Sequence, residues 1–328
     1  MKETVLVTGA SGALAKKTCE FLKDKFKLIC LTTNKKKCNN KNIFYWNTEL
    51  NIIDCKAFNN CQHIIHLAGF SVLNRWSKKN KNLMYSSRVN GAKLLFKTCE
   101  KLNIKPKTFV SASAIGIYGF DSGGIINEKS KLGNDWLAKM ATDWEKEADN
   151  FYEQFKSRTV KMRISLLIDK DSGILKYNLL SMQTGLGVIL GNKQSVINWI
   201  HILDAANFIN IAITNKNYSG AYNLATEKYI SQESFFKTIK KILFPYSIII
   251  SIPLIFPKLI LGKRVKILDF GNKIMCVKKL KKHNFIWKYK EFGDVINSIK
   301  KYLFFFNQKI FFFRLFHHLI KRKVLYQY

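Results

Sequence analysis

Short apolar runs alternate with longer amphipathic segments along the first two thirds of the chain. The apolar runs are rich in β-branched residues and lack strict alternation, which predicts strands covered on both faces. Strands are expected at 4–7, 28–33, 43–46, 63–67, 108–113, 160–167 and 221–225, and helices at 14–25, 83–102 and 137–155. Strands joined in this order by crossover helices predict an α/β fold with a doubly wound, Rossmann-type parallel sheet.

After about residue 168 this alternation loosens, and glycines punctuate a series of short elements. Such a change is typical of the segment in which an α/β enzyme builds a smaller substrate lobe. We therefore expect an NAD(P)-binding domain in residues 1–168, to which 203–227 return. The lobe is expected to comprise 169–202 and 228–303.

Two later segments are unusually apolar. Residues Tyr246 to Leu261 are interrupted by two prolines and a lysine and are too short to span a bilayer comfortably, which predicts buried structure. The tail 304–328 is aromatic and basic, and its pattern fits either a helix packed on its own domain or a weak contact with a membrane surface. No transmembrane segment is expected.

The composition adds a strong positive charge to this picture. The 328 residues include 55 Lys and Arg against 22 Asp and Glu, a formal net charge of +33, which attracts nucleic acid or anionic membranes. Only seven of the basic residues are arginine, whereas reading bases or clamping phosphates favours the planar Arg fork. The lysines fit solvated helix faces better, so no specific nucleic acid is expected as a partner.

Cysteine usage and the first residues bear on the compartment. The seven cysteines are scattered and form no Cys-x-x-Cys pair, which predicts a reducing compartment without a disulfide framework. An apolar run starts at Thr4 and leaves no room for a charged segment followed by a signal sequence. Together these features favour a cytoplasmic protein.

The sharpest local signal is a strand, a glycine turn and a helix in VLVTGASGALA, residues 5–15. Gly9 and Gly12 lack a Cβ, so the backbone can turn tightly and approach a pyrophosphate at the helix N-terminus. At the start of a βαβ chain this pattern predicts a dinucleotide site. The expected cofactor-binding residues of the turn are Gly9, Ser11, Gly12, Ala13 and Leu14.

The second strand predicts which dinucleotide is bound. No acidic residue stands between Lys25 and Thr48, whereas an NAD site typically presents one to the ribose 2′-hydroxyl. Asn34 and Lys35 instead offer a neutral donor and an ammonium group to a 2′-phosphate. This favours NADP(H) over NAD(H), with a merely solvated lysine run as the alternative.

The strand expected at 63–67 carries His63 and His66, a pair that suggests a metal site. Residues three apart on a strand point to opposite faces, so these two cannot converge on one ion, and no metal is expected. The small residues Leu67, Ala68 and Gly69 follow the strand and are expected to let the cofactor approach the backbone.

Further motifs extend the pattern along the chain. They are Thr8-Gly9-x-x-Gly12, Leu67-Ala-Gly69, Arg75-Trp76, Ser87-Arg88, Ser111 to Gly119, Asp135-Trp-Leu-Ala138, Trp144-Glu145, Gly173-Ile-Leu175, Gly185-Leu-Gly187, Trp199-Ile-His201-Ile with Asp204, and Gly220-Ala-Tyr-Asn223. With these motifs the sequence resembles the atypical short-chain dehydrogenase/reductase proteins of the uncharacterised epimerase family, which are relatives of the extended sugar-nucleotide epimerases with a distinctive C-terminal region. The resemblance holds from residue 4 to about 303.

The resemblance implies a nicotinamide cofactor lying across the strand ends, but it leaves catalysis open. Ordinary members of the superfamily transfer a proton with a Tyr-x-x-x-Lys pair, and the corresponding positions here hold Leu137 and Ala141. The remaining catalytic candidates are Ser113, where related enzymes place a Ser or Thr against the reacting oxygen, and Tyr118. Packing within its loop is the alternative role for Tyr118.

Two arginines and one histidine are candidates for ligand contacts. Arg75 and Arg88 are two of the few arginines in a lysine-rich chain, and the planar guanidinium can donate two parallel hydrogen bonds to one anion. We expect Arg75 to bind a cofactor phosphate and Arg88 to bind a substrate carboxylate or phosphate. A helix-end ion pair is the alternative for both. His201 precedes a helix that Asp204 can cap. We expect His201 near the substrate, in a hydrogen-bonding role rather than as a general base.

Three functions follow from this sequence. The first is an NADP(H)-binding epimerase or oxidoreductase that transfers hydride on a small carbonyl or sugar-nucleotide substrate. The second is a non-catalytic NADP(H)-binding protein with a regulatory or assembly role, suggested by the missing Tyr and Lys. The third, which the scarcity of arginine disfavours, is a nucleic-acid-binding protein. The sequence predicts no oligomeric state.

Overall fold

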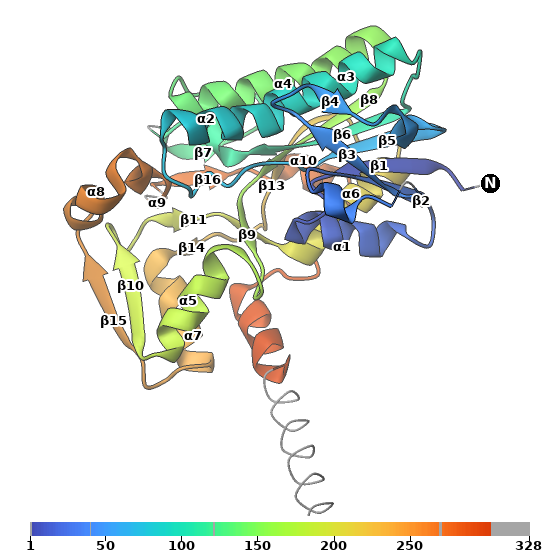
Figure 1. The fold of residues 1–328 in the computed structure, drawn as a ribbon. Coiled ribbons are helices and arrows are strands. Elements are labelled where there is room, and N and C mark those ends of the chain that lie inside the picture. Colours follow the sequence, from blue (N-terminus) through green and yellow to red (C-terminus); the bar gives the residue numbers. More distant parts are fainter. Residues whose placement is uncertain (1, 40, 121, 269–270, 303–328) are drawn as a thin grey trace, which may run out of the picture.

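An eight-stranded sheet forms the centre of the computed structural model, which describes residues 2–39, 41–120, 122–268 and 271–302 (Figure 1). Its strands are β1 (Thr4–Thr8), β2 (Lys27–Thr32), β3 (Ile43–Asn47), β4 (Ile52–Ile53), β5 (Cys61–His66), β6 (Thr108–Ala114), β8 (Arg158–Ile164) and β13 (Gly220–Leu224). They lie in the order β13-β8-β6-β5-β1-β2-β3-β4, and neighbouring strands are parallel except for β3 and β4.

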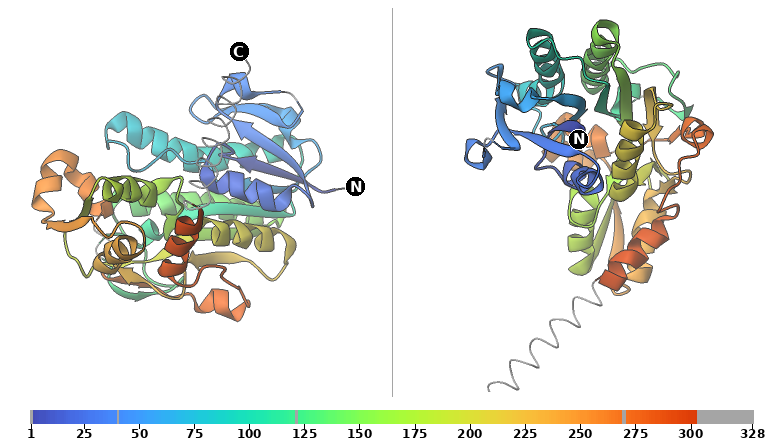
Figure 2. Two further views of the ribbon diagram at one scale, coloured as in Figure 1. Left: turned by 90° about the horizontal axis from the view of Figure 1, so that it is seen from below. Right: turned by 90° about the vertical axis from the view of Figure 1, so that its right-hand side faces the viewer.

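Helices cover both faces of this sheet (Figures 1 and 2). On one face α1 (Ala13–Leu22) packs against α6 (Ile202–Thr214), and on the other α3 (Gly91–Lys101) packs against α4 (Trp136–Phe155). Every residue of β1 is buried, as expected for a strand covered on both sides. The predicted doubly wound, Rossmann-type fold is confirmed.

The strand order creates the position for a ligand. The chain passes from β1 to β2 and β3 on one side, then returns to the other side of β1 to form β5 and β6. The connections therefore diverge beyond the carboxyl ends of β1 and β5 and leave a crevice there, which is where ligands bind in open α/β sheets.

The helix expected over 83–102 begins earlier and is not regular. It consists of α2 (Lys78–Tyr85), a wider π-helical turn at Ser86–Asn90, and α3. The turn lies close to the sheet: a Cβ on Gly91 would lie 3.1 Å from the His66 ring. Periodicity alone predicted one helix because a single π turn leaves the overall spacing of apolar residues almost unchanged.

The strand expected over 160–167 is divided. β8 ends at Ile164, and Ser165 donates both its amide and its hydroxyl to the Leu224 carbonyl. The chain then enters β9 (Leu166–Ile168), which pairs with β12 (Trp199–His201) in a separate two-stranded sheet. The continuous apolar run predicted one strand because its residues pack on hydrophobic clusters throughout, although β8 belongs to the first cluster and Ile168 of β9 to the second.

The C-terminal lobe has a hydrophobic cluster of its own, in which Trp199, Phe235 and Phe292 are buried. Its elements are α5 (Gly173–Gln183), β10 (Leu186–Leu190), β11 (Val196–Ile197), β14 (Ile230–Ser231), α7 (Gln232–Ile242), β15 (Ile248–Ile252), α8 (Ile255–Leu261), α9 (Val265–Leu268) and a final helical segment, 292–302.

Part of the region that the sequence assigned to the lobe packs instead on the Rossmann core. β16 (Lys273–Met275) pairs with β7 (Gly124–Ile126), and α10 (Lys278–Lys282) buries Leu280 in the first cluster. Asp204 holds this return in place, since its carboxylate accepts the amides of Lys288 and Tyr289. The expectation that Asp204 caps α6 was therefore wrong.

The segment Tyr246 to Leu261 is not buried, contrary to expectation. Ile248 is 65% exposed, Ile255 is 65% exposed and Leu259 is 82% exposed. The strand β15 pairs with β10 in a two-stranded sheet, and none of the described elements forms a further layer over it. Within the described residues no helix is both long and apolar enough to cross a bilayer. The tail 304–328 lies outside the described residues.

Arg158 stabilises the end of α6. Its guanidinium donates to the carbonyls of Ala212, Ile213 and Tyr218 and to the Thr108 hydroxyl, at 2.6 to 3.1 Å. Helix-terminal carbonyls lack partners within the helix, so this side chain satisfies groups that are shielded from water.

We expect Arg158→Met to lower the free energy of unfolding by about 3 kcal/mol, because several carbonyls lose a charged donor. Urea denaturation followed by circular dichroism measures this. Arg75→Met, at an exposed position, serves as the control and should change stability by less than about 0.5 kcal/mol. Equal stability of the two variants would contradict the assignment.

Candidate functional site

The turn between β1 and α1 is closed by glycine. The Gly12 amide donates to the Gly9 carbonyl at 2.8 Å. Gly9 has φ of +69°, and a Cβ there would lie 2.8 Å from the Ala68 nitrogen. The β1 end therefore approaches the β5 end more closely than any side chain allows. Gly12 caps α1 without a side-chain acceptor, and the first turn of α1 carries no acidic residue, so the positive end of the helix faces the crevice.

A buried hydroxyl joins β1 to β5. Thr8 Oγ1 accepts the amides of Leu67 and Ala68, each at 3.1 Å, and lies 2.8 Å from His66 Nδ1. Since two amides donate to this oxygen, its single proton is donated to Nδ1. His66 Nε2 must then carry the ring proton, which it donates to the Arg88 carbonyl at 2.9 Å. His66 is therefore neutral, and its complete burial lowers its pKa to about 4.

Two cavities, of about 500 and 440 Å³, meet over this turn. The first extends past the ends of β2 and β3, along Thr32, Thr33 and residues 46–49. The second extends toward the end of β6 and the start of α4. Residues that line both are Gly9, Gly12, Leu67, Ala68 and Gly69. The two cavities are thus halves of one crevice whose middle is the glycine turn.

Most of the expected cofactor residues line this crevice, which brings together Gly9, Ser11, Gly12, Ala13, Leu14, Leu67, Ala68 and Gly69. Three do not line it. Asn34 caps the short helix Lys35–Lys37 by accepting the Lys36 amide, and the Lys35 ammonium lies 5.0 Å from the centre of the Tyr45 ring. Arg75 is exposed in the loop before α2. Sequence proximity to the strand ends did not determine where these three side chains point.

Ser113 lies in the second half of the crevice, but its proton is already engaged. Its hydroxyl donates to Glu145 Oε1 at 2.7 Å. Arg163 holds both carboxylate oxygens of Glu145, through Nε and Nη2 at 2.8 Å each. Ser113 therefore presents only lone pairs to the crevice. Glu145 and Arg163 were missed as site residues, although Trp144-Glu145 belongs to the motifs of the resemblance.

Tyr118 is buried outside the crevice. Its hydroxyl donates to Asn223 Oδ1 at 2.6 Å and accepts from Arg163 Nη1 at 2.9 Å. Burial is the largest influence on its pKa, which is raised, so the phenol stays protonated. Because it does not face the two cavities, the structure does not bring Tyr118 together with Ser113 at a reacting atom. Loop packing, the alternative role, matches its position.

The positions of the missing Tyr and Lys are apolar in space as well. Leu137 lines the second half of the crevice together with Met140 and Trp144, and Ala141 is buried beneath them. None of these side chains exchanges a proton. This wall of α4 can shape a ligand and exclude water, but it supplies no acid or base.

Arg88 is the cation of the second half of the crevice. Its Nη1 donates to the carbonyls of Phe70 and Met84, and the guanidinium lies 5.4 Å from the centre of a Trp144 ring. Burial lowers its pKa to about 10, so it stays charged at neutral pH. Among the described residues no carboxylate forms an ion pair with it. A buried cation without an anion is the chemistry of a site for an anionic ligand.

His201 lies away from this crevice. Its Nδ1 accepts the Leu203 amide at 3.2 Å and so caps α6, and its ring lies 4.0 Å from that of Tyr289. Desolvation by burial lowers the pKa of His201 to about 4, which keeps it neutral. The hydrogen-bonding role agrees with its position, whereas neither cavity places it next to a ligand.

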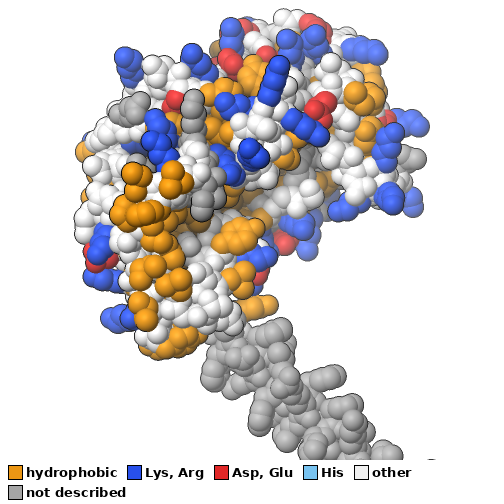
Figure 3. Space-filling view, turned by 60° about the vertical axis from the view of Figure 1, so that its left-hand side comes forward, with side chains coloured by type: hydrophobic (Ala, Val, Ile, Leu, Met, Phe, Trp, Pro, Cys, Tyr) orange, Lys and Arg blue, Asp and Glu red, His pale blue; other side chains and the backbone are white. Residues whose placement is uncertain are grey.

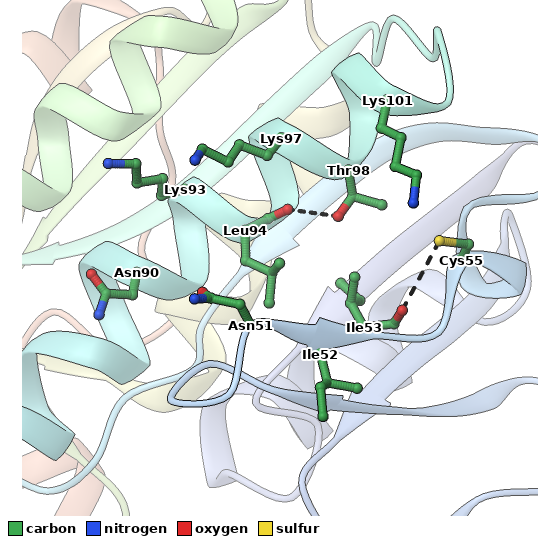
Figure 4. A pocket seen from close by; sticks show the side chains of 10 residues that line it. All are labelled: Asn51, Ile52, Ile53, Cys55, Asn90, Lys93, Leu94, Lys97, Thr98 and Lys101. Atoms are coloured by element: carbon green, nitrogen blue, oxygen red, sulfur yellow. Dashed lines mark hydrogen bonds between the residues drawn. The ribbon is translucent and has the colours of Figure 1, made fainter.

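Two other features carry no such chemistry. A cavity of about 630 Å³ between β4 and α3 is lined by Lys93, Lys97 and Lys101, one turn apart along α3 (Figure 4). It shares no residue with the crevice, and its lysines face solvent. His63 binds Glu3, not His66. In the part of the chain that the structure describes, no three His, Cys, Asp or Glu side chains are grouped to hold a metal.

The fold and this crevice define a Rossmann-type nucleotide-binding protein of the short-chain dehydrogenase/reductase type. Residues 5–225 match the model of the NAD dependent epimerase/dehydratase family, and the chain belongs to that family. The resemblance stated from the sequence is confirmed by relatives that are named epimerase family proteins.

One such relative is the epimerase family protein YfhF of Bacillus subtilis, 30% identical over 73% of this chain and 79% of its own length. Another is the chloroplastic epimerase family protein SDR39U1 homolog of Arabidopsis thaliana, 28% identical over 90% of this chain and 86% of its own. The crystal structure of human epimerase family protein SDR39U1 (isoform 2) with NADPH has the same fold. Its TM-score is 0.78 at 20% identity, covering 91% of this chain and 99% of the human one.

The buried state of His66 predicts a dependence of stability on pH. The pKa of His66 is about 4 in the folded protein and about 6.5 when unfolded, so between these values only the unfolded chain binds the proton. Stability is therefore lost as the pH falls through this window. We expect His66 to account for a decrease of about 2 kcal/mol between about pH 7 and about pH 5.

Urea denaturation at both pH values, for the natural chain and for His66→Gln, measures this contribution. The variant should lose less stability between the two pH values, while the decrease due to the neutral, buried His201 remains in both proteins. An identical pH dependence in the two proteins would show that His66 is not the group that resists protonation.

Proposed function

We propose that this protein binds NADP(H) across the crevice and transfers hydride on a small carbonyl or sugar-nucleotide-type substrate. The observation that carries the proposal is the glycine turn at Gly9 and Gly12, pressed against Ala68 at the open N-terminus of α1. A Cβ at Gly9 would collide with the backbone that closes this cradle. Family membership and the crystal structure of the human relative with NADPH support the same cofactor.

The residues present fit such a dinucleotide. The α1 amides and the turn suit its diphosphate, which needs donors and close backbone approach. The cavity along Thr32 and Thr33 suits the adenosine end, and the cavity at Ser113 and Trp144 suits the other end. When bound, the nicotinamide supplies the carbon that gives or takes hydride.

The preference for NADP(H) rests on charge at the end of β2. At the end of β2 the first half of the crevice presents two threonines and no acidic residue; the one carboxylate of its lining, Glu49, follows β3 instead. Asn34 and Lys35 follow directly, and although neither lines the cavity, a flexible lysine at that rim attracts a dianionic phosphate. Lys36 and Lys37 add to the same local field.

The substrate is expected next to Ser113 and Arg88. Because Ser113 donates to Glu145, its lone pairs accept a hydrogen bond from a substrate hydroxyl and thereby orient it. When hydride leaves the carbinol carbon for the oxidised cofactor, the hydroxyl proton goes to water, and in the reverse direction water returns it to the oxygen. Arg88 holds an anionic group of the substrate, since its charge has no partner within the described residues. We propose that the substrate enters between the Rossmann domain, residues 1–168 with 203–227, and the lobe, which the sequence placed at 169–202 and 228–303 and from which β16 and α10 are now excluded.

A second function, a non-catalytic NADP(H)-binding protein, is favoured by a specific observation. Leu137 and Ala141 replace the proton-transferring pair, and the two remaining hydroxyls, of Ser113 and Tyr118, already donate to protein acceptors. Such a protein would sense the cofactor in a regulatory or assembly role. Seven free thiols support a reducing compartment such as the cytoplasm for either function.

We expect Gly12→Val to weaken NADPH binding at least about tenfold, because its side chain would stand at the mouth of the cradle. NADPH fluorescence in a titration measures the dissociation constant. Gly123→Val, at a position where a Cβ meets nothing within 4 Å, is the matched control and should bind normally. Unchanged affinity in a folded Gly12 variant would refute the cradle.

The same titration with NADH tests the phosphate preference. NADPH is expected to bind at least about tenfold more tightly, and this advantage should shrink at high salt because it is electrostatic. Lys35→Gln should lower NADPH affinity without changing NADH affinity, with Lys105→Gln as a control elsewhere on the surface. Equal binding of both cofactors would contradict the role of the β2 end.

A screen for NADPH oxidation on carbonyl substrates separates the two proposed functions. Turnover that Ser113→Ala reduces without loss of NADPH affinity supports the enzyme, since in that proposal the serine lone pairs orient the hydroxyl that the carbonyl becomes once water has delivered its proton. Tight NADPH binding with no turnover on any carbonyl supports the sensor instead.

A further inference from the structure

The lobe leaves a large apolar surface uncovered on one side. Figure 3 shows hydrophobic side chains gathered over the outer side of the lobe. We call these residues the apolar face: Leu186, Ile248, Ile250, Ile255, Phe256 and Leu259. They come from β10, β15 and α8, and all are more than a third exposed. Single exposed apolar residues are ordinary, but a contiguous group of this kind marks an interaction site.

The fold itself explains why the face stays uncovered. Leu186 pairs with Ile248 in the two-stranded ladder, and both are exposed. The residues that alternate with them turn inward: a Cβ on Gly187 would lie 3.2 Å from the ring of Phe236 and 3.4 Å from Ile249. One side of the sheet thus packs on the lobe's core, and no described element lies over the other.

The charge around the face has a single sign. The face lies on two segments, 172–203 and 234–268, and neither contains an acidic residue. Exposed lysines within them include Lys176 on α5 and Lys258 between Phe256 and Leu259 on α8. An occupant of this surface therefore meets apolar side chains on two segments whose charged residues are all basic.

This charge argues against two occupants that the chain itself provides. A second copy carries the same net charge of +33, so two copies repel each other. The tail 303–328 contains five basic residues and no acidic one, so it too is repelled by the surroundings of the face. The occupant with the complementary charge is anionic.

The kind of basic residue distinguishes an anionic membrane from an acidic protein. Protein interfaces are enriched in arginine and depleted in lysine, whereas the basic residues of these two segments are lysines apart from the half-buried Arg264. Isoleucine, leucine and phenylalanine combined with lysine are typical of surfaces that lie in the bilayer interface. We propose that the apolar face docks on an anionic lipid bilayer, with the α8 side chains among the lipid headgroups and Lys258 at their phosphates.

None of the six residues of the face lines either half of the crevice. Docking and cofactor binding are therefore separate properties, and the proposal does not depend on the proposed function. NADPH titration reports on the crevice, and vesicle binding reports on the face. Circular dichroism, which does not depend on a bound cofactor, shows whether a variant of the face is folded.

The experiment uses the full chain and sedimentation with vesicles of phosphatidylcholine, with and without phosphatidylglycerol. The natural protein is expected to bind the anionic vesicles and not the neutral ones. Ile255→Glu with Leu259→Glu should weaken this binding at least about tenfold, because two carboxylates would enter an anionic interface. The control, Tyr152→Glu with Ile286→Glu, changes the net charge equally at exposed positions outside the face and should retain most of the binding.

Several results would overturn the proposal. They are no binding of the natural protein to anionic vesicles, equal binding to neutral ones, equal loss in the control, and unchanged binding in the face variant, which would assign membrane contact to the tail. Sedimentation velocity adds one more outcome. A dimer of the natural chain that becomes a monomer in the face variant would assign the face to a second copy.

Discussion

The crevice depends on one buried hydroxyl at the junction of two strands. Thr8 receives the amides of Leu67 and Ala68 and donates to His66, which in turn reaches the backbone of Arg88. Three elements, β1, β5 and the π turn before α3, are thereby held together by bonds that water cannot replace. This arrangement fixes Gly9 against Ala68, and only with that contact does the α1 N-terminus open onto a space large enough for a dinucleotide.

A second buried network engages the two hydroxyl groups that were candidates for catalysis. Glu145 and Arg163 form a buried ion pair, and such a pair tolerates the loss of neither partner because the remaining charge would be uncompensated. Ser113 and Tyr118 are bonded to opposite ends of this pair. The network therefore stabilises the junction of β6, β8 and α4. Because both hydroxyls donate their protons to protein acceptors, neither proton is available for transfer to a substrate.

Much of the fold was predictable because burial on both faces of a parallel sheet leaves a pattern in the composition of each strand. The glycine turn was predictable for a similar local reason, since a missing Cβ is visible in the sequence. The positions of Asn34, Lys35 and Arg75 were not, because a long polar side chain near a strand end can point in many directions. The prediction that Tyr246–Leu261 is buried was wrong for a different reason. Apolar composition indicates a preference for burial, but only the packing of neighbouring elements shows whether the segment is covered.

The sequence by itself determined the class of the fold, the cradle for a diphosphate and the absence of the usual proton-transferring pair, because each depends on residues close together in the chain. Tertiary structure alone decided that His66 is neutral and buried and that it joins Thr8 to the Arg88 carbonyl. It also decided that Arg88 has no carboxylate partner among the described residues and that Ser113 donates its proton to Glu145. Those properties arise between residues 18 to 60 positions apart. Their distances and solvent exposure are set by how the strands and helices pack, which no local pattern records.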